Sequence, residues 1–358
     1  EQQVLLASRR PRGHNEKFPW LVHGLTGPGE MQYETDRKCF IGRNRSLMFP
    51  AALSENTLAG TVGNVLDPVF SLRRCLSLAA GETADLVFYL GVAAEQDQAL
   101  SLAERINKHL QQPWQPVAPP MIPITAAKPP IAVPHCEALR GWEAAPTGGE
   151  AAPTGWEAAP TGGEAAPTLS HWNGHGGFSA DGSEYVIPLA PDSAGRLQGP
   201  PLPWINVVAN PTTGFLASET GAGYTWSRNS RQHRLTPWFN DPVLDPHGEA
   251  FYIRDEDAGQ YWSPLPGPVP GGAYATRHGF GYSHYRHNSH GLEQETWQFV
   301  APDESVKITR MQITNRSGKP KRLSLFAYQQ IVLGVLPEET RDAIVSEWHG
   351  NHGMLVAR

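Results

Sequence analysis

The sequence predicts a mainly β protein built as a large antiparallel sandwich. Two observations lead to this prediction. Proline (33) and glycine (36) make up about 19% of the 358 residues, against a usual share of roughly 12%, and outside one repeated segment they are scattered as turn residues. Between these turns, short runs of alternating apolar and polar residues recur, which is the period of a half-buried strand.

Length and composition narrow the possible functions. A chain of 358 residues with 40% apolar residues is long enough for one large or two medium domains. A net charge of −6 without a long basic run argues against nucleic acid as a partner. Three widely spaced cysteines match neither a disulfide framework nor a zinc site. We expect a cytoplasmic protein with no metal, no other cofactor and no membrane span, since apolar stretches of 18 or more residues are absent.

Residues 1–110 are expected to form strands followed by one short helix. The clearest pair of strands lies within residues 73–93, with a turn at Ala80-Gly81-Glu82. After this turn apolar residues occupy every second position from 84 to 90. Residues 95–110 change to a helical period, with acidic residues at the start and one apolar face made of Ala99, Leu102, Ala103, Ile106 and Leu110.

Residues 111–168 are expected to be a disordered linker rich in proline and glycine. A proline-rich stretch is followed, at residues 141–168, by four near-copies of the unit G-[WG]-E-A-A-P-T. The seven-residue period does not indicate a coiled coil, because each unit carries a proline and lacks a pair of large apolar residues. The segment therefore predicts an extended connection between two folded parts.

Residues 169–358 are again expected to be strands. Two strands flank a turn at residues 315–320, and a hairpin within residues 248–264 turns at Asp257-Ala258-Gly259. Frequent short strands and turns are typical of a sandwich.

A family resemblance gives this sandwich a more specific identity. The stretches HWNGHGGFSADGSEY (171–185) and PWINVVANPTTGFLASETGAGYTWSRNSRQHRLTPWFNDPVLDPHGEAFYIRDE (203–256) resemble the N-terminal super-β-sandwich of glycoside hydrolase family 94. That family holds cellobiose- and chitobiose-phosphorylase-like enzymes and a module of cyclic β-1,2-glucan synthases, and the likeness to the synthase module is the strongest. Independently, YETDRKCFIGRNRSL (33–47) and residues 58–93 resemble the second half of the same sandwich. The resemblance implies two halves in permuted order, closed within one chain or exchanged between two copies.

The resemblance implies no catalytic residue in this chain. In the family the general acid and most phosphate ligands belong to an (α/α)6 barrel, which nothing here matches. The sandwich loop that faces the barrel's active site corresponds to RLTPWFNDP at residues 234–242. Tryptophan can stack on a sugar, and the polar residues can bind hydroxyl groups or phosphate. The candidate carbohydrate-binding residues are Trp226, Arg234, Trp238, Asn240, Asp241, Arg277 and His278.

Simpler interpretations stand beside these. The loop at 234–242 could serve only to pack against a barrel, with Asp241-Pro242 forming a turn. Four histidines at 278, 284, 287 and 290 show no spacing typical of a metal site.

The function expected from the resemblance is a noncatalytic carbohydrate-binding part of a glucan synthase or phosphorylase-like protein. The alternative is a fragment of an active enzyme that needs a barrel in trans or downstream. A docking module without sugar affinity fits the same residues. The expected partners are a β-glucan oligosaccharide, phosphate, and a helical barrel domain or a second copy of the chain. A larger synthase would provide any association with a membrane. Because the chain does not begin with Met, we expect a fragment or a processed piece.

Overall fold

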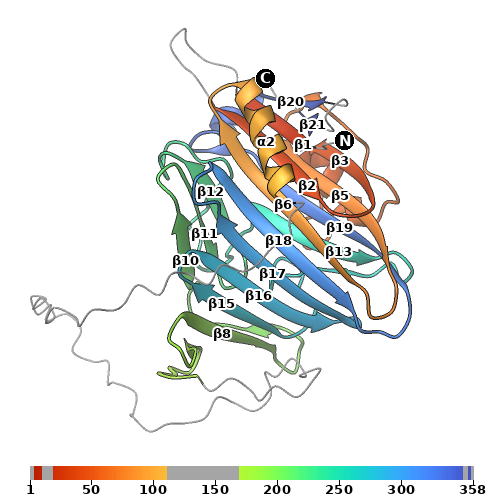
Figure 1. Ribbon diagram of the computed structural model, residues 1–358, viewed down its shortest axis with the longest axis vertical. Coiled ribbons are helices and arrows are strands. Elements are labelled where there is room, and N and C mark those ends of the chain that lie inside the picture. The colour runs from red at the N-terminus through yellow and green to blue at the C-terminus, as the bar shows by residue number, and fades with distance from the viewer. Residues whose placement is uncertain (1–3, 10–18, 111–168, 350–353, 356–358) are drawn as a thin grey trace, which may run out of the picture.

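The protein is a two-layer β-sandwich (Figure 1). The computed structural model describes residues 4–9, 19–110, 169–349 and 354–355, so the predicted linker at 111–168 lies outside the described residues. The predicted mainly β sandwich is confirmed: one layer is a 13-stranded sheet, and the other consists of a five-stranded and a three-stranded sheet.

The large sheet runs almost entirely antiparallel. Its path is β4 (Gly63–Asn64), β20 (Ile344–His349), β21 (Met354–Leu355), β1 (Val4–Arg9), β2 (Trp20–Thr26), β6 (Thr83–Ala93), β18 (Val306–Asn315), β17 (Leu292–Val300), β16 (Tyr282–Ser289), β15 (Tyr274–Gly279), β8 (Glu184–Pro191) and β7 (Gly177–Phe178), with β9 (Leu197–Gln198) beside β8.

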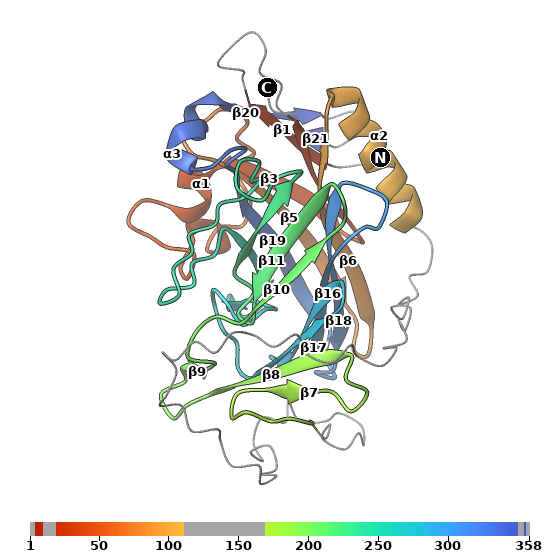
Figure 2. The same cartoon turned by 90° about the vertical axis from the view of Figure 1, so that its left-hand side faces the viewer.

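The second layer contains two smaller sheets. The five-stranded sheet is ordered β14 (Tyr261–Trp262), β13 (Glu249–Asp255), β19 (Lys321–Gln330), β5 (Pro68–Leu78) and β3 (Glu30–Asp36). The three-stranded sheet is ordered β10 (Ile205–Ala209), β11 (Thr213–Ser218) and β12 (Gly223–Ser227). Figure 2 shows β10 and β11 lying in front of the large sheet. The predicted hairpin at 248–264 is confirmed, because β13 pairs with β14.

Alternation along β6 places apolar residues on both faces of the large sheet. Leu86 and Phe88 point into the sandwich core, while Val87 and Tyr89 point to the opposite face. The predicted helix is α2 (Gln96–Leu110), which covers that opposite face with Ala99, Leu102, Ala103 and Ile106. Burying Leu102 and Ile106 contributes about 3–6 kcal/mol at typical side-chain transfer free energies. Two short helices, α1 (Arg37–Ile41) and α3 (Pro337–Thr340), and 3₁₀ turns at Ala51–Leu53 and Arg341–Ala343 complete the described elements. Among the described residues, none of the helices combines the length and the apolar character that crossing a membrane would need.

Strands from the two ends of the sequence pair with each other within one chain. Strand β6 pairs with β18 from Gly91–Val306 to Thr83–Thr314, and β5 pairs with β19 from Leu78–Lys321 to Val69–Gln330. The two predicted strands within 73–93 are therefore correct, but they lie in different layers, as do the two strands around residues 315–320. Each turn carries the chain from one layer to the other. Whether this order is permuted relative to other members of the family stays a prediction.

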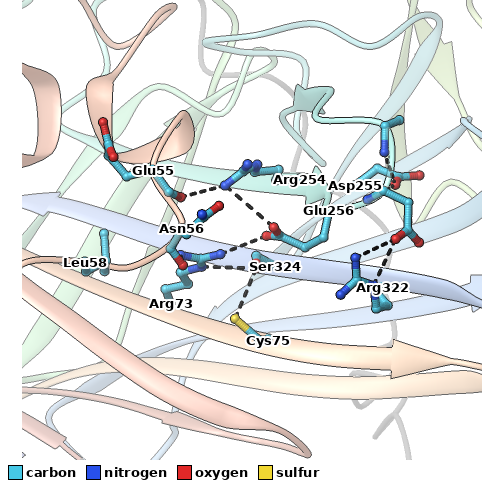
Figure 3. A network of polar contacts seen from close by, with 12 residues as sticks. Glu55, Asn56, Leu58, Arg73, Cys75, Arg254, Asp255, Glu256, Arg322 and Ser324 are labelled. Carbon is cyan, nitrogen blue, oxygen red and sulfur yellow. Dashed lines mark hydrogen bonds and ion pairs between the residues drawn. The ribbon is translucent and has the colours of Figure 1, made fainter.

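A polar network closes the outer face of the five-stranded sheet (Figure 3). Arg73, 2% exposed, donates to Glu256 Oε1 at 2.8 Å and to Ser324 Oγ at 3.1 Å. The Arg254 guanidinium lies 3.6 Å from Glu256 Oε2 and donates to the Glu55 carbonyl at 2.6 Å. The Glu256 carboxylate thus pairs with two buried cations. The Glu55 carbonyl, in the segment that covers this face, accepts a hydrogen bond from Arg254.

Candidate functional site

An aromatic group lies on the outer face of the three-stranded sheet. Strand register pairs Trp226 of β12 with Gly214 of β11. The next residue of β11, Phe215, points to the opposite face of the sheet and belongs to the core. A Cβ atom on Gly214 would clash with Trp226 Cζ2. The missing side chain therefore lets the indole lie directly across the backbone of β11, with the ring half-buried.

Three of the predicted residues, Trp226, Arg234 and Trp238, meet around the ring of Tyr224. The ring centroids of Tyr224 and Trp226 are 5.2 Å apart, and those of Tyr224 and Trp238 are 5.5 Å apart in a stacked arrangement. The Arg234 guanidinium lies 5.5 Å from the Tyr224 ring centroid. Trp226, Arg234 and Trp238 are only partly buried, so parts of two indole rings beside a cation remain open to a ligand.

Backbone carbonyls, not carboxylates, hold Arg234 in place. Its main chain bridges β12 and Gly334, with the Arg234 N–H donating to the Gly334 carbonyl at 3.1 Å. Its Nη1 lies 3.4 Å from the Val335 carbonyl oxygen and 3.5 Å from that of Trp238. Within the described part of the chain no carboxylate forms an ion pair with this guanidinium, which leaves its positive charge available to an anion.

A buried ion pair between Lys307 and Glu249 holds the segment that carries Arg234 and Trp238 against the core. Lys307 Nζ donates to Glu249 Oε2 at 2.6 Å and lies 4.4 Å from the centroid of Phe215. The other oxygen, Glu249 Oε1, accepts from the hydroxyls of Thr225 on β12 and Thr236 in the segment, both at 2.6 Å. Burial acts to raise the pKa of Glu249, but Lys307 and the two hydroxyls hold that pKa below its ordinary value. The carboxylate is therefore charged and ties β12 to the segment that carries Arg234 and Trp238.

Asn240 and Asp241 lie farther along the same segment and have a different setting. Asn240 is exposed with φ of 49°, and Asp241 Oδ1 accepts from the N–H groups of Val243 and Leu244 at 2.9 and 3.1 Å. These contacts form an Asx turn, as in the simpler of the two sequence interpretations. Neither residue makes a contact with the aromatic group among those that the structure describes.

Arg277 and His278 lie on β15 and bind other neighbours. Arg277 pairs with Glu184 at 2.9 Å, and the ring of His278 bonds to the Ser283 hydroxyl and to the Trp204 carbonyl. Burial lowers the pKa of His278 to about 4, so the ring is neutral at pH 7. None of the hydrogen bonds or ion pairs that the structure gives these two residues reaches the aromatic group.

Sequence reasoning missed two residues, one in the aromatic group and one at the turn between β11 and β12. Tyr224 occurs two positions before Trp226, so strand alternation places both rings on one face and could have revealed it. Glu219, 5% exposed, accepts from the Trp204 N–H at 2.7 Å. Burial, with a contribution from Asp245, raises the pKa of Glu219 to about 7. No sequence signal distinguishes this glutamate from one in an exposed turn.

The histidines that follow His278 each stack on a different aromatic ring. His284 stacks on Trp297, and His287 and His290 stack on Tyr274 and Trp262. In the described ranges no three histidine, cysteine or acidic side chains converge as metal ligands would.

Comparison with known proteins identifies the fold. A family model described as the supersandwich domain of glycosyl hydrolase 94 matches residues 1–109 and 184–358. The chain belongs to glycosyl hydrolase family 94. Both matched segments contribute strands to each layer, so the supersandwich domain is the structure described above.

The relatives act on carbohydrates, and all of them are much longer. Cyclic beta-(1,2)-glucan synthase NdvB of Rhizobium meliloti is 39% identical over 191 residues, covering 53% of this chain and 7% of the synthase. N,N'-diacetylchitobiose phosphorylase of Vibrio furnissii is 26% identical over 51% of this chain and 23% of its own length. 3-O-beta-D-glucopyranosyl-beta-D-glucuronide phosphorylase of Paenibacillus borealis is 30% identical over 44% of this chain and 19% of its own length. The chain thus spans less than a quarter of each of these relatives.

Proposed function

We propose that this supersandwich is a noncatalytic carbohydrate-binding domain that recognises β-glucan oligosaccharides. The observation that carries the proposal is the group of Tyr224, Trp226 and Trp238 beside Arg234. Aromatic faces suit the apolar faces of sugar rings, and a guanidinium suits hydroxyl groups or phosphate. The names of the relatives suggest the ligand class, since they include a cyclic beta-(1,2)-glucan synthase and a phosphorylase of a beta-D-glucopyranosyl glucuronide.

The acidic residues of the segments on either side of β12 support a binding role over a catalytic one. Asp241 is engaged in a turn, and Glu219 accepts from a backbone N–H. Asp245 Oδ2 accepts from the hydroxyls of Ser218 and Thr220. Inverting cleavage of a glycoside needs an acid and an activated water or phosphate on opposite faces of the sugar. Carboxylates engaged in this way are suited to holding loops in place.

Titration of β-1,2-gluco-oligosaccharides tests the proposal. Tryptophan fluorescence and calorimetry of the whole chain should show saturable binding. Trp226→Ala and Trp238→Ala should each weaken it about tenfold or more, equivalent to about 1.4 kcal/mol. The matched control is Trp297→Ala, because Trp297 lies on the opposite face of the large sheet. Absence of binding by the unaltered chain, or equal losses in all three variants, would overturn the proposal.

A second candidate function is suggested by apolar side chains beside the site. Phe239, Val243 and Leu244 are exposed, at 45%, 87% and 75%. Exposed large apolar side chains of this kind suit a partner domain, and the family resemblance suggests a helical catalytic barrel. In that case the chain is part of an active phosphorylase or synthase. Phosphate-dependent release of glucose 1-phosphate from the same oligosaccharides by the isolated chain would favour activity and contradict the noncatalytic proposal.

A further inference from the structure

Strand β10 is a free edge of the three-stranded sheet. Among the described strands it pairs only with β11. The hairpin closes with Asn210 N–H donating to the Thr213 carbonyl at 2.9 Å. Antiparallel pairs alternate between hydrogen-bonded and non-hydrogen-bonded, so the backbone groups of Ile205, Val207 and Ala209 point away from β11. No described residue supplies a backbone partner for them.

The same three residues also present exposed side chains. Ile205 is 48% exposed and Val207 is 58% exposed, and Ala209 is exposed as well. The intervening residues hold the strand in place: Val208 belongs to the core, and Asn206 Nδ2 donates to the carbonyls of Gly279 and Tyr282. In the described part of the chain, the edge is therefore held in place from the core side, and its outer side chains are apolar and exposed.

Within the residues that the structure describes, the strand has none of the features that usually protect an edge. Natural edge strands carry charged residues, proline or a bulge, or lie under another element. Residues 205–209 read INVVA, without charge or proline, and their pairing with β11 is regular. Such an edge is a template for one more strand.

We propose that β10 pairs antiparallel with β10 of a second copy of this chain, across a two-fold axis at Val207. In this register Val207 faces its own equivalent, and Ile205 faces Ala209 on both sides of the axis. A large side chain then meets a small one twice, with no charge repulsion anywhere along the strand. Each hydrogen-bonded pair exchanges two bonds, so the interface gains about six backbone hydrogen bonds.

Self-pairing is favoured over an unrelated peptide because the strand is complementary to itself. The joined sheet runs β12-β11-β10-β10-β11-β12 through both copies. It extends within its own plane, so the outer face that carries the partly exposed Trp226 stays open in each copy. Two aromatic groups then share one continuous surface. The inference does not depend on sugar binding.

The experiment is light scattering on a sizing column and sedimentation equilibrium over a wide range of chain concentration. The unaltered chain should form dimers. Val207→Pro removes an outward N–H without breaking a ladder bond to β11, and Val207→Lys places two like charges at the axis. Each should raise the dimer dissociation constant at least about 100-fold, which corresponds to about 2.7 kcal/mol. Val243→Lys, at an exposed valine outside the strand, is the matched control and should still dimerise.

Circular dichroism should show that the variants remain folded, and Val207→Lys decides the test if the proline variant does not fold. A monomer at every concentration would overturn the proposal. So would a dimer that persists in Val207→Lys, or one that Val243→Lys abolishes equally. Oligosaccharide titration of Val207→Lys should be unchanged, which separates this proposal from the proposed function.

Discussion

Glu219 is a buried acid at the turn between β11 and β12. Its carboxylate accepts from Trp204, and the groups that face it electrostatically are Asp245 and Tyr285. Because burial raises its pKa from 4.5 to about 7, the folded chain holds a proton that the unfolded chain releases. Stability contributed by the protonated form is therefore complete below about pH 4.5 and is lost as the pH rises through 7.

Glu219→Gln should remove this pH dependence. The amide oxygen can still accept from Trp204, but it never ionises. The free energy of unfolding of the variant relative to the unaltered chain should rise by up to about 3 kcal/mol between pH 5 and pH 8. Urea denaturation at several pH values, followed by tryptophan fluorescence, measures this difference. A difference that is constant with pH would contradict the assignment.

At this scale the sequence predicted part of the site. Trp226, Arg234 and Trp238, which the family resemblance offered as separate candidates, lie together around Tyr224. The place of Tyr224 beside Trp226 could have been predicted from strand alternation, because the two residues lie two positions apart on β12. The inward orientation of His278 and the burial of Glu219 could not, because both depend on Trp204, more than ten residues away along the chain.

The Lys307–Glu249 pair joins elements of both layers. Lys307 belongs to β18 of the large sheet and Glu249 to β13 of the five-stranded sheet, and the same carboxylate bonds to β12 and to the segment that carries Arg234 and Trp238. Both side chains are almost fully buried. Loss of one partner leaves an uncompensated buried charge. Loss of both partners leaves no buried charge without a partner.

Lys307→Met should lower the free energy of unfolding by about 3–5 kcal/mol. The double variant Lys307→Met, Glu249→Leu should be less destabilised than the sum of the two single variants. Arg316→Met breaks the exposed pair with Glu293 and should cost less than about 1 kcal/mol. Chemical denaturation of all four variants tests this, and similar losses for Lys307→Met and Arg316→Met would refute it.

The positions of helices and strands were easier to predict from the sequence than the pairing between strands. Local period identified α2 and the hairpin of β13 and β14. It also identified β5 and β6 as strands but not as members of different layers. The layer of each strand is fixed by pairing with β19 and β18, which lie far away in the sequence. Alternation reports which residues are buried, and it carries no information on which distant strand buries them.

At the scale of the whole molecule, residues 4–110 and 169–355 depend on each other, because their strands alternate within both layers. Each layer contains strands from before residue 110 and from after residue 169, and β6 lies between β2 and β18. Neither segment can bury its core residues without the other, because the main core cluster includes Leu86 and Phe88 from one and Phe251 and Leu325 from the other.

Cutting the chain between residues 111 and 168 should therefore leave a noncovalent complex. A specific protease site placed at Gly155 allows a single cut. The two pieces should elute together from a sizing column and separate only in denaturant, because the paired strands and the shared core stay intact. Separation in native buffer would show that the sandwich does not close within one chain.

The sequence separation between paired strands also determines how long an early strand lacks its partner during synthesis. Thr83 and Thr314, which bond to each other across β6 and β18, are 231 residues apart. A ribosome adds roughly 5–20 residues per second, so β6 waits roughly 10–45 s before β18 leaves the exit tunnel. During that interval the apolar β5 and β6 have no native neighbour from the later segment. Holdase chaperones that bind nascent chains should therefore improve the yield of this domain more than that of a sandwich whose sequential strands pair.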